Sequence, residues 1–124
     1  MSDDVLAVGG AWGPPARRPA PLHGTDRDWI EGGTHFRMAG DGPAVVLIHG
    51  VGLDLFMWDD IVTLLARDFT VLRYDMLGHG RSAKPPGARV LGDFQRQLTA
   101  LMDAYDMRRA AVVGKRVVRQ VQKT

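Results

Sequence analysis

The sequence of 124 residues contains no cysteine and only two serines, Ser2 and Ser82. Without cysteine, neither a disulfide nor a zinc site built on thiolates can form. Neither serine has a glycine two residues before it and another two residues after it. The sequence therefore excludes a Gly-x-Ser-x-Gly elbow, the strained turn that lifts a serine hydroxyl above the end of a strand.

Long hydrophobic runs are also missing. The longest apolar stretch, around Ala44 to Ile48, is far shorter than the roughly 20 residues that cross a bilayer. The first residues, Met-Ser-Asp-Asp, show no basic region followed by an apolar core, so we expect no membrane span and no secretory signal. The length allows at most one domain, and a cytoplasmic location is the resulting expectation.

Acidic residues are absent from the end of the chain. All 14 precede Lys115, whereas Lys115, Arg116, Arg119 and Lys123 lie in the last ten residues and give the sequence its pI of about 9.4. This segment, 115–124, reads as a basic tail. It has few charges and no aromatic residue, so nucleic-acid binding, which would weaken steeply with salt, is the least favoured hypothesis.

What the chain does contain is a graded organisation. Residues 1–24 are rich in glycine and proline and predict a disordered arm, which leaves 25–114 as the folded part. Two short strands, Asp28 to Glu31 and Thr34 to Met38, flank Gly32-Gly33 and predict an antiparallel hairpin. The segment from Gly40 to Pro43 is a strong turn signal before the next element.

Apolar patterning then alternates between strands and helices. Buried strands are predicted at Ala44 to Ile48, Thr70 to Tyr74 and Ala110 to Val113. Helices are predicted at Phe56 to Arg67 and Asp93 to Tyr105. Their expected buried sides are Trp58, Ile61, Leu64 and Leu65 in the first helix, and Phe94, Leu98, Leu101, Met102 and Tyr105 in the second. This order predicts an α/β fold, with a hairpin and three parallel strands joined by two right-handed crossover helices.

Two glycine-rich segments follow the first two parallel strands. His49-Gly50-Val51-Gly52 comes directly after Ile48, and Asp75-x-x-Gly78-x-Gly80-x-Ser82 comes after Tyr74. With Trp58 between them, this combination resembles the α/β-hydrolase fold family over roughly Trp29 to Gly114. The residues of these motifs are most similar to those of its lactonase and carboxylesterase branch, which includes 3-oxoadipate enol-lactonase-like proteins. The resemblance implies hydrolysis of a small carboxylic ester or lactone with no cofactor and no metal.

The resemblance also implies roles for these residues. The turn would supply an oxyanion hole through Val51 and Gly52, with His49 and Gly50 ordering the loop. The second turn would be shaped by Asp75, Gly78, His79, Gly80 and Ser82. In it, Asp75 would accept hydrogen bonds from the backbone amides of the turn up to Ser82.

Other chemistries remain as alternatives. Context disfavours His49 as a general base and Ser82 as a nucleophile, either alone or with Lys84. Spacing disfavours a metal site built from His49, Asp54, Asp75 and His79. A phosphate loop at Gly114-Lys115 is excluded by Arg109 and Arg116, which stand where glycine and Ser/Thr are required. His23 and His35 show no partner pattern.

The resemblance stops after Gly114, where Lys115-Arg116-Val117 stand in place of the nucleophile elbow. We therefore expect a truncated or frame-shifted N-terminal part of a hydrolase, inactive alone. The strand Ala110 to Val113 would be an open edge unless the tail or another chain covers it. The alternative is half of a split hydrolase that assembles with a separate C-terminal polypeptide.

Overall fold

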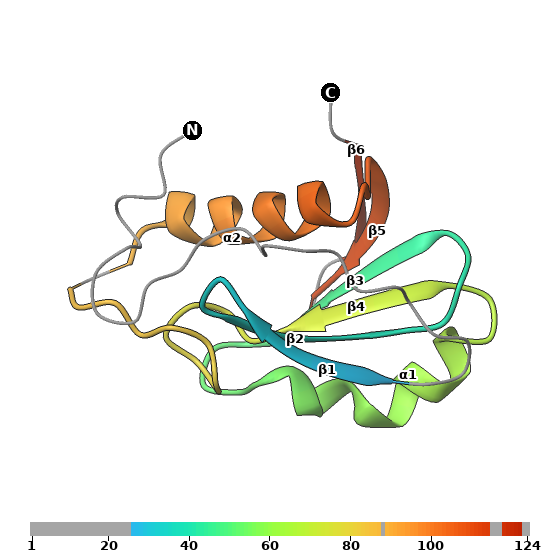
Figure 1. The fold of residues 1–124 in the computed structure, drawn as a ribbon, viewed down its shortest axis with the longest axis horizontal. Helices are drawn as coiled ribbons and strands as arrows, with labels where there is room; N and C mark the ends of the chain where they lie inside the picture. The colour runs from blue at the N-terminus through green and yellow to red at the C-terminus, as the bar shows by residue number, and fades with distance from the viewer. Residues whose placement is uncertain (1–25, 88, 115–117, 123–124) are drawn as a thin grey trace.

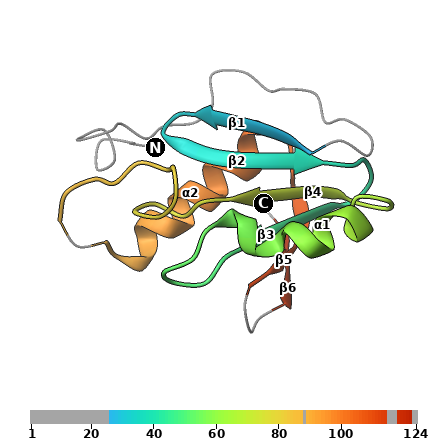
Figure 2. The ribbon, with the colours of Figure 1, turned by 90° about the horizontal axis from the view of Figure 1, so that it is seen from below.

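The computed structural model describes residues 26–87, 89–114 and 118–122, the last five by their backbone alone. The predicted disordered arm, 1–24, lies outside these residues. Within them, six strands form one mixed sheet in the order β1-β2-β4-β3-β5-β6 (Figures 1 and 2). The strands are β1 Arg27–Glu31, β2 Thr34–Ala39, β3 Ala44–Ile48, β4 Thr70–Tyr74, β5 Arg109–Val113 and β6 Val118–Gln122.

Strand direction follows the predicted pattern. β1 and β2 pair as an antiparallel hairpin, and β2 continues antiparallel onto β4. β3 lies between β4 and β5 and is parallel to both. The prediction of a hairpin and three parallel strands is therefore confirmed. It could be made because short apolar runs bounded by glycine and proline are strong local signals.

Helices cover the two faces of the sheet. The 3-10 helix η2 (Leu55–Trp58) and α1 (Asp59–Leu65) lie on one face, and α2 (Leu91–Ala104) lies on the other (Figure 1). Successive residues of each strand alternate between the faces, so Val46 and Leu72 pack with Leu101 of α2. Val45 and Val71 pack on the opposite side with Val62 of α1. The core thus has two halves separated by the sheet.

The first crossover differs from its prediction. We expected one helix over Phe56 to Arg67 that buries Ile61 and Leu64, but Ile61 is 36% and Leu64 58% exposed, and Leu55 and Val62 are buried instead. The chain begins as a 3-10 helix, which turns by about 120° per residue rather than 100°. Over four such residues, the direction of the side chains differs by about 80° from that in an α-helix. A prediction that assumes an α-helical period throughout therefore places the buried side on the wrong residues.

Part of the basic tail forms a further strand. Backbone residues Val118–Gln122 form β6, which pairs antiparallel with β5 from Arg109 to Val113. β5 is therefore an interior strand, because the tail covers the edge that would otherwise be open. The tail's residues carry no turn signal in the sequence, so its pairing with β5 was only one of the alternatives that the sequence left.

Candidate functional site

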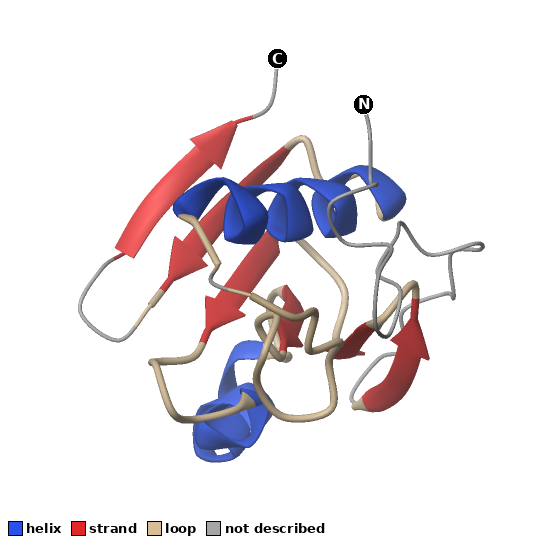
Figure 3. Cartoon of the chain, turned by 90° about the vertical axis from the view of Figure 1, so that its left-hand side faces the viewer, coloured by secondary structure: helices blue, strands red, loops and turns tan. Residues whose placement is uncertain are grey.

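Two loops at the carboxyl ends of β3 and β4 hold the residues that the sequence singled out. The arrows of the three parallel strands point toward the same side, where these loops gather (Figure 3). One loop runs from His49 to Asp54, and the other from Asp75 to Ser82. Ligands of open parallel sheets bind at this edge because the strands deliver loops from neighbouring positions there.

The first loop is a tight turn from Gly50 to Leu53, which we call the oxyanion turn after the role that the sequence resemblance implies for it. The Leu53 amide donates to the Gly50 carbonyl at 3.1 Å. Gly52, the third residue of the turn, has φ of 81°, the left-handed value that a type II turn requires at this position. Val51 is 88% exposed, and within the described part of the chain its amide donates to no protein acceptor. The turn therefore leaves one backbone N–H available at the sheet edge.

His49 fastens this turn to the second loop. Its Nδ1 lies 2.7 Å from the Gly50 carbonyl oxygen, and its Nε2 accepts the Met76 amide at 2.9 Å. Nε2 can accept only without a hydrogen, so Nδ1 carries the hydrogen and donates. Burial lowers the pKa of His49 and the nearby His79 ring adds to this, whereas the Gly50 carbonyl opposes it. Both ring nitrogens are occupied, which leaves His49 no free lone pair to act as a base.

Asp75 is the hub between the two loops. Its Oδ1 accepts the Leu55 amide at 2.8 Å, and its Oδ2 accepts the Arg81 amide at 2.9 Å. Burial alone would raise the pKa of this carboxyl, but the hydrogen bonds from Arg81, His35 and Leu55 outweigh burial and lower the pKa. Asp75 thus remains ionised and binds amides on both sides of the site.

Ser82 is fully used by this network. Its hydroxyl donates to the Asp75 carbonyl at 2.6 Å and accepts the His35 amide at 2.9 Å, and the residue is 3% exposed. The Lys84 ammonium binds the Gly80 carbonyl at 2.6 Å. Neither the environment of the hydroxyl nor that of Lys84 is one that activates a serine nucleophile.

Glycine at position 80 lets the second loop close over the Asp75 carboxylate. A Cβ on Gly80 would lie 2.3 Å from Asp75 Oδ2, and its φ is 49°. The loop is further closed by the Gly78 amide, which donates to the Ala83 carbonyl at 2.8 Å, and by the His79 amide, which donates to Met76 at 2.9 Å. Position 80 therefore has no room for a side chain.

Two buried side chains of the site were not predicted. His35 is fully buried and contacts both Asp75 and Asp28, although we expected it to have no partner. Gln97 of α2 is equally buried; it accepts the Leu77 amide at 3.0 Å and donates to the Asp75 carbonyl at 3.1 Å. No spacing in the sequence could reveal either residue, because each meets partners far along the chain.

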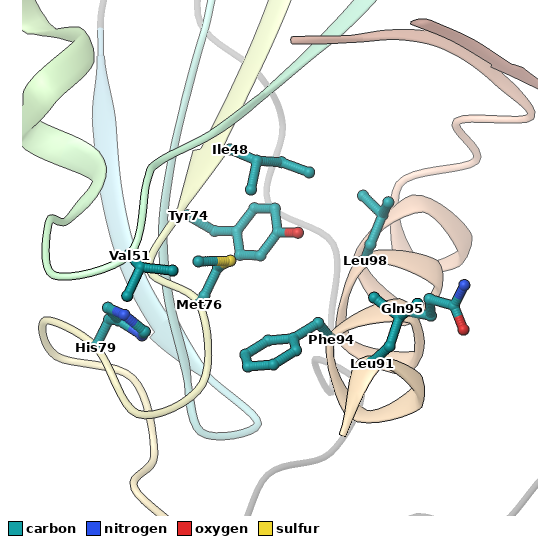
Figure 4. Close-up of a pocket in the computed structure, with 9 residues that line it drawn as sticks. All are labelled: Ile48, Val51, Tyr74, Met76, His79, Leu91, Phe94, Gln95 and Leu98. Atoms are coloured by element: carbon teal, nitrogen blue, oxygen red, sulfur yellow. The ribbon is translucent and has the colours of Figure 1, made fainter. Parts of the chain in front are cut away.

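An open apolar pocket of about 400 Å³ lies between the strand ends and α2 (Figure 4). Ile48, Tyr74 and Met76 line it on the sheet side, and Phe94 and Leu98 line it on the helix side. The side chains of Val51, His79, Leu91 and Gln95 complete the lining.

Among the described residues, no group of three or more His, Asp or Glu side chains is arranged to hold a metal ion, so His49, Asp54, Asp75 and His79 form no such group. No helix in the described ranges combines the length and apolarity needed to cross a bilayer.

Comparisons with known proteins match this architecture. The family model of the α/β-hydrolase fold matches residues 43–115, more than half of the chain. An uncharacterised protein of Mycobacterium tuberculosis is 36% identical over 101 residues, which are 82% of this chain and 28% of that protein. The fluoroacetate dehalogenase of a Burkholderia species is 45% identical over 51 residues, 41% of this chain and 17% of the dehalogenase.

Among solved structures, the enol-lactonase of Burkholderia xenovorans LB400 superposes with a TM-score of 0.63 at 36% identity. The superposition covers 65% of this chain and 33% of the enol-lactonase. The chain therefore spans about a third or less of the length of these relatives.

Proposed function

Since this chain belongs to the α/β-hydrolase fold family, we propose that residues 26–113 carry the oxyanion turn of a hydrolase that acts on carboxylic esters or lactones. The observation that supports this role is the amide of Val51, which has no acceptor in the described part of the chain and lies on a turn at the ligand-binding edge of the sheet. The similarity to an enol-lactonase favours esters and lactones as the substrate class.

The chemistry assigned to the turn is stabilisation of negative charge. When a nucleophile attacks an ester carbonyl, the carbonyl oxygen becomes an oxyanion, and a preorganised N–H beside it is worth about 100- to 1000-fold in rate. Val51 supplies one such donor, and Gly52 gives the turn the backbone conformation that presents it. His49 and Asp75 hold the turn but do not touch the reacting atoms.

Unaided turnover is not expected from these 124 residues. Acyl transfer needs an attacking oxygen with a base beside it, and the Ser82 hydroxyl is committed to Asp75 and His35. His49, the histidine nearest the turn, has both nitrogens occupied. We therefore propose that the nucleophile, the base and the second oxyanion donor come from outside these residues, and that a separate C-terminal polypeptide is one source, as in a split hydrolase.

The test of inactivity uses the purified chain with p-nitrophenyl acetate and an enol-lactone. We expect the rate of the buffer alone, and no covalent adduct with a fluorophosphonate probe. Ser82→Ala is the matched control. Turnover lost in this variant would identify Ser82 as the nucleophile, and turnover kept in it would reveal an unassigned group; either result would contradict the proposal.

The test of the oxyanion role adds a candidate C-terminal polypeptide that restores activity. Val51→Pro then removes the N–H, and proline suits the second position of a type II turn, so the turn itself is kept. We expect kcat to fall about 100- to 1000-fold in Val51→Pro and little in Val51→Ala. Equal activity of the two variants would exclude the Val51 amide as a donor.

A further inference from the structure

His35 stands between two carboxylates inside the protein. Its side chain is fully buried in β2, with Nδ1 at 2.6 Å from Asp75 Oδ2 and Nε2 at 2.5 Å from Asp28 Oδ1. A neutral imidazole has one N–H, so one contact would set a lone pair against a carboxylate oxygen. With both aspartates ionised, both contacts are hydrogen bonds only when each ring nitrogen carries a hydrogen, which makes the ring an imidazolium.

The two carboxylates beside His35 have different surroundings. Asp28 lies 3.8 Å from a guanidinium nitrogen of Arg37 and 3.6 Å from one of Arg81, so the outer carboxylate has cations on its solvent side. On the inner side, the Asp75 carboxylate accepts from the backbone amides of Leu55 and Arg81 and contacts the His35 ring. His35 is therefore the side chain in contact with the inner carboxylate within the described residues.

The inner carboxylate connects His35 to the oxyanion turn. Asp75 Oδ2, the atom that His35 contacts, also accepts the Arg81 amide, while Oδ1 accepts the amide of Leu55. Leu55 begins η2, two residues after the turn ends at Leu53. A rotation of the carboxylate would move both amide contacts together.

The backbone strengthens the same link. The Asp75 amide donates to the His35 carbonyl at 2.9 Å, and the His35 amide donates to Ser82, whose hydroxyl returns to the Asp75 carbonyl. These backbone hydrogen bonds fix the position of the His35 backbone relative to that of Asp75. The His35 ring can then still rotate about its side-chain bonds, and its contact with Asp28 restrains that rotation.

We propose that His35 is the positioning residue of the site: as an imidazolium clamped by Asp28, it fixes the orientation of the Asp75 carboxylate and thereby the place of the oxyanion turn. Its importance for catalysis rests on the proposed function, but the clamp itself does not. The role differs from core filling because it needs the hydrogen on Nδ1 and not merely the volume of the ring.

The first test is the ring of the unmodified protein, observed by ¹H–¹⁵N NMR near neutral pH. The proposal expects two slowly exchanging ring N–H protons, assigned to His35 in the unmodified protein through couplings within its own ring. A single ring N–H on His35 would overturn the imidazolium, and this result requires no variant to fold.

The second test is hydrogen exchange of the amides of Leu55 and Arg81. His35→Asn keeps a donor near the Nδ1 position. The protection of both amides should therefore change less in His35→Asn than in His35→Ala. In His35→Ala we expect protection to fall about tenfold or more at both amides, while amides of the β3–β4 pairing keep theirs. Equal protection in His35→Ala and the unmodified protein would overturn the proposal. The measurement contains no substrate, so it is independent of the Val51 tests.

Discussion

Replacing Asp75 with asparagine should cost a large part of the stability of this fold. The carboxylate is 1% exposed and accepts from the amides of Leu55 and Arg81 and from the ring of His35. Asparagine retains one acceptor oxygen and turns an NH₂ group toward a donor. Losing two charge-assisted hydrogen bonds, each worth about 1.5–3 kcal/mol, predicts a loss of about 3–6 kcal/mol. Domains are typically stable by only about 5–15 kcal/mol.

The pH dependence gives this prediction a second readout. Because the folded-state pKa of Asp75 is lowered, its contribution is present above the ordinary aspartate pKa and is lost as pH falls through the folded-state pKa. The unmodified protein should therefore lose stability as pH falls below about 4. Asp75→Asn should lack this part of the acid loss, because it has no carboxyl to protonate.

Urea unfolding followed by circular dichroism, repeated from pH 3 to pH 7, measures both effects. Asp68→Asn is the matched control, since Asp68 is exposed and its replacement should change the free energy of unfolding by less than about 0.5 kcal/mol. An Asp75→Asn variant as stable as the control, with the acid loss of the unmodified protein, would refute the assignment of Asp75 as the hub.

Three further changes have expected outcomes. Gly80→Ala should destabilise by about 3 kcal/mol in urea unfolding, because its Cβ meets the Asp75 carboxylate at 2.3 Å, whereas Gly52→Ala, with a positive φ but no atom within 4 Å, should cost about 1 kcal/mol. The His49 ring, whose pKa is lowered by burial, should titrate by NMR below 6.5; its contribution to stability is then lost as pH falls from about 6.5 through the folded-state value, and His49→Gln should remove that slope. Leu101→Ala, at a core position 1% exposed, should lower the free energy of unfolding by about 2–5 kcal/mol, and a loss below 1 kcal/mol would contradict the packing under α2.

The strands of this fold could be predicted because their signals are local. Ala44–Ile48 and Thr70–Tyr74 are apolar runs that begin and end at turns, and both appear at the predicted residues. The first crossover was harder, since the period of η2 differs from that of α1 and displaced Leu64 to the surface. The pairing of β6 depends on where the tail meets β5 in space, which its composition does not encode.

The site divides in the same way. Motif spacing located the loops around Val51 and Asp75, because glycines and an aspartate after buried strands are visible in the sequence. The groups that hold those loops are not visible, since His35 lies 40 residues from Asp75 and Gln97 lies 63 from Thr34. Such contacts follow from the sheet order, which brings β2 beside β4 and places α2 over both.

Most contacts that orient the oxyanion turn come from residues that precede α2, and Gln97 of α2 adds one to the Asp75 carbonyl. His49 binds the turn to Met76, Asp75 binds Leu55, and His35 binds Asp75, and all of these residues precede β5. None of these contacts involves a nucleophile, so the turn is held in place without one. Under the proposed function, a polypeptide that completes the active site would meet a preformed donor at Val51, so its binding energy would not be needed to build the turn.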